Sequence, residues 1–127
     1  MVIKLQIAVL GAVGILAAAS PLSAHHSWPV NCSVPMTVTG TVTGYTWANP
    51  HVMIGLDVKG DDGTVEQWRV GGPSLNRMAG NAWDRTTLKV GDVITGTGNR
   101  FLDGSNVLKL AKVVMSDGKE MVLYARC

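Results

Sequence analysis

The chain has 127 residues, with 11 Lys and Arg against 9 Asp and Glu and a formal net charge of +2. This length is typical of a single domain. The near-neutral charge argues against a nucleic-acid partner, because contacts with phosphates require a cationic groove. No run of like charges indicates a disordered tail.

The N-terminal segment, residues 1–24, has the pattern of a secretory signal peptide. Lys4 supplies a positive start, residues 7–19 form an apolar block, and Ala24 is the small residue that a signal peptidase site requires. An uncleaved membrane anchor is the alternative, because an uncharged run of this length approaches the roughly 20 residues that span a bilayer. We favour cleavage after Ala24, which predicts a periplasmic or secreted protein with no stable membrane span.

The sequence contains two cysteines, Cys32 and Cys127. In an oxidising compartment they are expected to form a disulfide between the start of the mature protein and its last residue. Closing so long a loop is worth on the order of 4 to 5 kcal/mol in the chain-entropy model. Two free thiols or an intermolecular bridge are the alternatives.

The first strand is expected after Pro35, in "MTVTGTVTGYTWANP". We predict that residues 25–36 are an N-terminal extension and that residues 37–127 form the folded domain. Alternation of β-branched and aromatic residues is typical of a strand. One face is expected to carry Thr39, Thr41, Thr43, Tyr45 and Trp47. Gly40 and Gly44 within the same run indicate a bend or bulge.

Two more strands are predicted in residues 51–58 and 64–70, joined by a hairpin turn at residues 61–63. In the second strand, Val52, Ile54, Leu56 and Val58 are expected to face inward.

A short helix is expected next, with Gly72 as N-cap, Pro73 at the first helical position and Gly80 as the stop. Two or three strands then follow in residues 88–124. Three strands, a short helix and further strands are the element order of an OB-fold, a small Greek-key barrel. We therefore predict an all-β, OB-like barrel with one short helix, and a β-sandwich is the alternative.

Several segments resemble an uncharacterised family of small secreted bacterial proteins, a domain of unknown function. They are "AHHS", "GTVTGYTWANPHVMIGLDV", "WRVGGPSLNRMAG", "LKVGDVITGTGNR" and "DGSN". The most specific parts are the His-His-Ser start and the Trp-x-Asn-Pro-His motif at residues 47–51. The resemblance implies export to the periplasm and an all-β domain, and it implies no activity. The family pattern lacks the cysteine at position 32, so the resemblance does not support the disulfide.

Cleavage after Ala24 would make His25 the first residue of the mature protein. Its α-amine and imidazole would form a bidentate chelate, and the imidazole of His51 would complete a three-nitrogen site of the histidine-brace type. Planar nitrogen donors suit Cu(II), which also leads the stability order of divalent metals. The α-amine must lose its proton to bind, and its reference pKa is about 7.7 to 8.0. His26 is the alternative to His51, and zinc is the alternative metal.

Met53 and Asp57 share the outward strand face with His51 and are candidates for an additional ligand. Period-2 spacing places Met53 nearer to His51 than Asp57. The ordinary interpretation is that His25 and His26 are polar residues at a frayed terminus, and that His51 is bonded to the backbone in a turn.

The alternative function is a metal-free module that binds a small molecule or a protein partner in the periplasm. Its expected surface is the threonine face, with Tyr45 and Trp47 as stacking residues, because OB barrels bind ligands across one face. No serine or cysteine has a base placed beside it, so we favour a non-enzymatic role.

Overall fold

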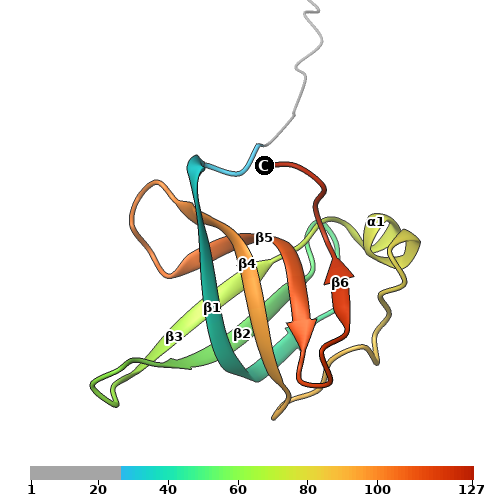
Figure 1. The fold of residues 1–127 in the computed structure, drawn as a ribbon. Helices are drawn as coiled ribbons and strands as arrows, with labels where there is room; N and C mark the ends of the chain where they lie inside the picture. The colour runs from blue at the N-terminus through green and yellow to red at the C-terminus, as the bar shows by residue number, and fades with distance from the viewer. Residues whose placement is uncertain (1–26) are drawn as a thin grey trace, which may run out of the picture.

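The computed structural model describes residues 27–127, so the predictions for the signal peptide, His25 and His26 fall outside the described residues. The elements in chain order are β1 (Val30–Thr46), β2 (Met53–Lys59), β3 (Val65–Gly71), α1 (Leu75–Gly80), β4 (Val93–Phe101), β5 (Val107–Met115) and β6 (Glu120–Val122) (Figure 1). The predicted all-β class with one short helix is confirmed. Between residues 27 and 127 no helix has the length and apolar character needed to cross a membrane.

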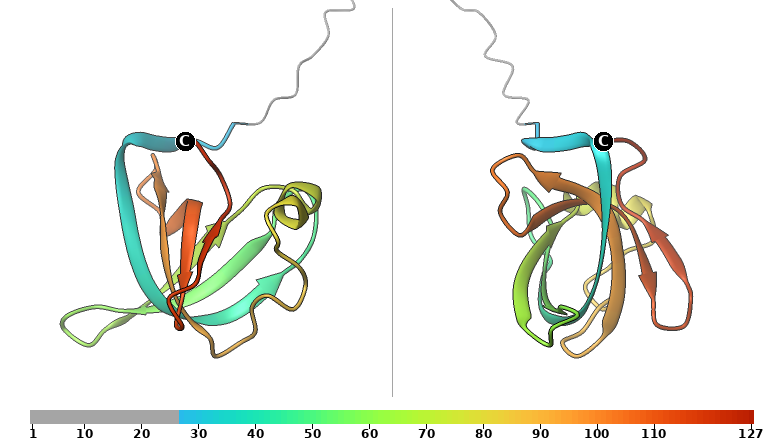
Figure 2. Two further views of the ribbon diagram at one scale, coloured as in Figure 1. Left: turned by 45° about the vertical axis from the view of Figure 1, so that its right-hand side comes forward. Right: turned by 60° about the vertical axis from the view of Figure 1, so that its left-hand side comes forward.

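The strands close into a barrel. Their order is β3-β2-β1-β4-β5-β6, and an additional β3–β5 pairing joins the two sides. That pairing is parallel, with Val70 opposite Leu108, whereas the other pairings are antiparallel. Figure 2 shows the strands curling around a common interior, with β6 outside the ring on β5. The closed ring confirms the OB-like barrel over the sandwich.

The core fills the interior of this ring. Along β2 and the residue before it, Val52, Ile54 and Leu56 are at most 1% exposed, as the alternation predicts, whereas Val58 is only partly buried. Side chains of this size contribute about 1.5 to 3 kcal/mol each when fully buried. Strands β3, β4 and β5 and the helix add further buried side chains, among them Trp68, Val70, Met78, Ile94, Leu108, Leu110 and Val113.

Strand β1 begins within the segment that the sequence assigned to an N-terminal extension. Val30 pairs with Phe101 of β4 and Pro35 pairs with Asn99, and the register shifts between these two positions. Proline is tolerated beside such an irregularity because it has no N–H to donate to a regular ladder. Residues 30–36 are therefore part of the sheet, and the boundary at residue 37 does not mark the start of the strand.

A bulge in β1 corrects the prediction for Tyr45 and Trp47. The register shifts between Val42, which pairs with Leu56, and Gly44, which pairs with Gly55. Tyr45 consequently lies opposite the buried Ile54. One extra residue in a strand moves the following side chains to the other face. Tyr45 and Trp47 therefore pack against the core instead of continuing the threonine face.

The helix begins two residues later than its glycine and proline indicate. Its N-cap is Ser74, not Gly72, and Gly80 is its last residue. The backbone stays extended through Pro73 because the Gly72 N–H donates to the Val52 carbonyl at 2.9 Å, and the Val52 N–H donates to the Pro73 carbonyl at 3.1 Å. These bonds extend the β2–β3 pairing, so the helix begins only at Leu75.

The predicted disulfide between Cys32 and Cys127 is present, with the two Cα atoms 5.6 Å apart and a sequence separation of 95. It ties the beginning of β1 to the segment that follows β6.

Candidate functional site

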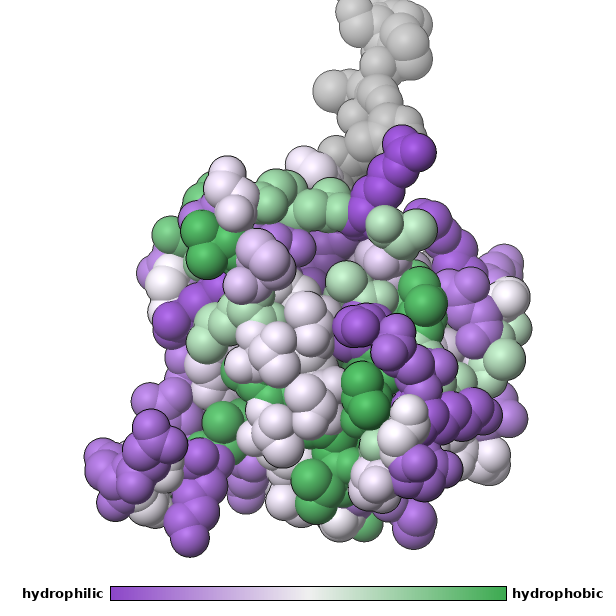
Figure 3. Space-filling view, viewed as in Figure 1, coloured by the Kyte–Doolittle hydropathy of each residue, from purple (hydrophilic) through white to green (hydrophobic). Residues whose placement is uncertain are grey.

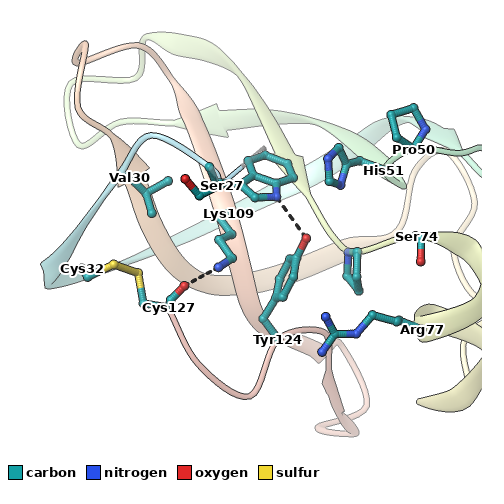
Figure 4. A pocket seen from close by; sticks show the side chains of 12 residues that line it. Ser27, Val30, Cys32, Pro50, His51, Ser74, Arg77, Lys109, Tyr124 and Cys127 are labelled. Carbon is teal, nitrogen blue, oxygen red and sulfur yellow. Dashed lines mark hydrogen bonds between the residues drawn. A yellow bond between two sulfur atoms is a disulfide. The ribbon is translucent and has the colours of Figure 1, made fainter. Parts of the chain in front are cut away.

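A pocket of about 470 Å³ opens where these two segments meet the loop before β2 and the start of α1 (Figure 4). We call it the Tyr124 pocket. Its side chains include Trp28, His51, Arg77, Lys109 and Tyr124. The volume lies within the range of sites that bind small molecules.

Trp28 connects the walls of this pocket. Its indole Nε1 donates to the Tyr124 hydroxyl at 3.0 Å. Its ring meets His51 edge-on at a centroid distance of 4.7 Å and Phe101 at 5.6 Å. The indole lies against Gly71, where a Cβ atom would collide with it. The lack of a side chain at Gly71, the last residue of β3, therefore leaves the space that the Trp28 indole occupies.

His51 is held in one tautomer. Its Nδ1 lies 3.2 Å from the Gly72 carbonyl oxygen, which can only accept, so Nδ1 carries the hydrogen and Nε2 of the neutral ring keeps its lone pair. Within residues 27–127, Nε2 has no hydrogen-bond partner. Metal-binding histidines commonly have this arrangement, with the other ring nitrogen donating to a carbonyl.

The Asn-Pro-His part of the sequence motif positions that imidazole. The Asn49 Oδ1 accepts from the Leu75 N–H, the first of α1, at 3.1 Å, and Pro50 lines the pocket beside His51. The loop before β2 is thereby attached to the helix, which fixes the direction from which His51 enters the pocket.

The two candidates for an additional metal ligand are placed differently. Met53 pairs with Gly71, and its Sδ lies 2.8 Å from where a Gly71 Cβ would be, next to Trp28. Asp57 pairs with Gln67 at the far part of β2. Met53 therefore lies beside Trp28, which contacts His51, whereas Asp57 lies farther along the strand. Residues 27–127 alone contain no cluster of three or more His, Cys, Asp or Glu residues that could hold a metal.

Tyr45 and Trp47 do not line the Tyr124 pocket. Their rings lie 6.0 Å apart, and the Tyr45 hydroxyl donates to the Asp84 carbonyl at 2.8 Å. Burial raises the pKa of Tyr45, and the negative charge of Asp84 raises it further. Tyr45 thereby connects β1 to the loop after α1.

Two threonine hydroxyl groups of β1 are hydrogen-bonded to threonine hydroxyl groups of β4. Thr37 and Thr97 are 3.0 Å apart at their Oγ1 atoms, and Thr39 and Thr95 are 2.9 Å apart. The β1–β4 side in Figure 3 shows a broad central area of intermediate hydropathy.

The cationic side of the pocket was missed by sequence reasoning. Lys109 Nζ lies 4.4 Å from the centroid of the Tyr124 ring, and Arg77 Cζ lies 5.9 Å from it. Figure 4 shows the two side chains reaching Tyr124 from different directions. Desolvation lowers the pKa of Lys109, and the nearby Arg77 charge lowers it further, whereas burial raises the pKa of Tyr124. No motif links these positions, and only folding brings them together.

A model for a family described as "Family of unknown function (DUF6152)" matches residues 12–108, most of the chain. The chain belongs to this family. The DUF6152 match contains Trp28, His51 and Arg77, and it ends before Lys109 and Tyr124. The expected membership in an uncharacterised domain family is thus confirmed. A comparison with curated proteins found no match.

Proposed function

We propose that this protein is exported and binds Cu(II) through the α-amine and imidazole of His25 together with the imidazole of His51. The observation that carries the proposal is the state of His51, whose Nδ1 hydrogen is used by Gly72 and whose Nε2 lone pair is unpartnered within residues 27–127. A neutral imidazole of this kind is a good ligand for copper.

Ser27 supplies the connection to His25. It lines both pockets that His51 lines, and His25 precedes it by two residues. An extended residue spans about 3.3 to 3.6 Å, so an N-terminus at His25 is within reach of His51. This supports a site that assembles only after the leader is removed at Ala24.

The charge of the pocket sets a condition on this proposal. The positive charges of Arg77 and Lys109 disfavour a metal cation close to them. Figure 4 shows His51 and Lys109 on different sides of the pocket. A nitrogen site at the His51 side is compatible with that arrangement. The role we propose is copper delivery, sequestration or sensing in the periplasm, without catalysis.

The test is a Cu(II) titration of protein exported by its own leader, with the N-terminus at His25 verified by intact mass. Calorimetry and electron paramagnetic resonance should show tight one-to-one binding with nitrogen ligands. His51→Ala and one extra glycine before His25 should each abolish it. His26→Ala and Met53→Leu are the matched controls: the first should bind normally, and the second should change the spectrum more than the affinity.

Binding that survives both the His51→Ala change and the added glycine would exclude the site. Loss in His26→Ala together with retention in His51→Ala would assign the second imidazole to His26.

A second candidate is a metal-free binding module, and the presence of Arg77 and Lys109 in the pocket favours it. For this candidate the extra glycine before His25 should leave ligand binding intact.

A further inference from the structure

We infer that the Tyr124 pocket binds a small organic acid, with the carboxylate at Arg77 and Lys109 and the apolar part against Trp28 and Tyr124. This inference goes beyond the proposed function, because it requires no metal and no residue before Ser27.

The charge of the pocket determines the sign of the ligand. No Asp or Glu side chain is among the described residues that line it. The two ion pairs found within residues 27–127, Lys89 with Asp92 and Lys112 with Glu120, lie elsewhere. Lys109 already donates to an oxygen of Cys127, so Arg77 is the pocket cation that lacks an anionic partner among residues 27–127, and an anionic ligand would complement it.

The Arg77 and Lys109 side chains both have N–H donors available for a ligand. The Arg77 guanidinium donates no hydrogen bond within residues 27–127 and contacts the Tyr124 ring at 5.9 Å, so its planar group is available for a carboxylate. Lys109 donates to the Cys127 backbone oxygen, and an ammonium group has three hydrogens. Desolvation lowers the pKa of Lys109, and the positive charge of Arg77 lowers it further, which fits a pocket with a net positive potential.

The walls distinguish an organic acid from an inorganic anion. Trp28 and Tyr124 present aromatic rings at a centroid distance of 6.4 Å, and Pro50 and Pro73 also line the cavity. Such walls stabilise a ligand through buried apolar area. Phosphate or sulfate would use the charges and leave these walls without a partner.

The pocket is also preorganised. The Trp28–Tyr124 hydrogen bond and the Cys32–Cys127 disulfide hold its two terminal segments together. A site that is already ordered loses less free energy to side-chain ordering when the ligand binds.

The experiment is calorimetry on the processed protein after treatment with a chelator, using benzoate as the probe. Benzoate should bind at least tenfold more tightly than acetate, benzyl alcohol or inorganic phosphate. Arg77→Ala and Lys109→Met should each weaken benzoate binding about 10-fold or more, as expected for a lost charge-assisted hydrogen bond. Arg85→Ala, which removes the same charge outside the pocket, should bind like the wild type.

Arg77 is exposed on α1, where alanine is a good helix former, so this variant should fold. Circular dichroism would verify that both pocket variants do. No benzoate binding, equal binding of phosphate, or equal losses in Arg77→Ala and Arg85→Ala would overturn the inference. The protein with an extra glycine before His25 separates the two proposals, because it should lose copper and keep benzoate.

Discussion

The indole nitrogen of Trp28 donates a 3.0 Å hydrogen bond to the hydroxyl of Tyr124, a residue 96 positions away. The bond joins the segment before β1 to the segment after β6 across the mouth of the Tyr124 pocket. Trp28 also contacts His51, so the same indole supports the imidazole side and the cationic side of the pocket.

Gly71→Ala should displace this indole. The new Cβ would collide with the Trp28 ring and approach the Met53 Sδ, and overpacking of this kind costs about 1 to 3 kcal/mol. We expect a lower free energy of unfolding by chemical denaturation and weaker binding of both copper and benzoate. Gly44→Ala is the control, because a Cβ there meets no atom within 4 Å. Equal stability of the two variants would show that the position of Trp28 does not depend on the absence of a side chain at Gly71.

Reduction of the Cys32–Cys127 disulfide should destabilise the barrel. The bond closes a loop with a sequence separation of 95, for which the chain-entropy model gives on the order of 4 to 5 kcal/mol. Urea unfolding with and without reductant, and of the Cys32→Ser, Cys127→Ser double variant, would measure the loss. Reductant should have no effect on the double variant. An unchanged midpoint in the reduced wild type would contradict the prediction.

Asp84→Asn should make the free energy of unfolding less sensitive to low pH. The Thr86 hydroxyl and backbone N–H each donate to Asp84 Oδ1 at 2.7 Å, and they hold the pKa of this carboxyl below its usual value. A lowered pKa contributes stability above the unfolded value of about 3.9, and the contribution is lost as pH falls through the folded value. Urea midpoints measured from pH 7 down to pH 2 should therefore fall less steeply in the variant than in the wild type.

Asp61→Asn is the matched control for this experiment, since within residues 27–127 the Asp61 carboxylate accepts no hydrogen bond. A variant at Asp84 that follows the Asp61 control at every pH would refute the role of the Thr86 hydrogen bonds.

Tyr45→Phe should destabilise the protein by about 1 kcal/mol, the net worth of one hydrogen bond. The change removes the 2.8 Å bond to the Asp84 carbonyl and leaves the ring packed on the core. Thr46→Ser, on the exposed side of the same strand, should be near neutral. Equal effects of the two substitutions would mean that Tyr45 behaves as a surface residue of the threonine face.

The strands, the turns and the disulfide pairing were predictable because each depends on a local pattern or on a simple inventory. Alternation places Val52, Ile54 and Leu56 in the core once any strand forms. Two cysteines in a chain with a signal-peptide pattern have one intramolecular pairing available. Local patterns failed for Tyr45 because they count residues from the start of the strand, and the bulge after Val42 restarts the count.

The sequence by itself determined the all-β class and the element order of an OB-like barrel, and it favoured the Cys32–Cys127 bond and His51 as a candidate ligand. Only the tertiary structure decided what surrounds His51. The parallel β3–β5 pairing closes the ring and sets Gly71 opposite Lys109, and the disulfide returns the C-terminal segment to the start of β1. Because these contacts join residues far apart in the chain, no local spacing of amino acids encodes the pocket that they form.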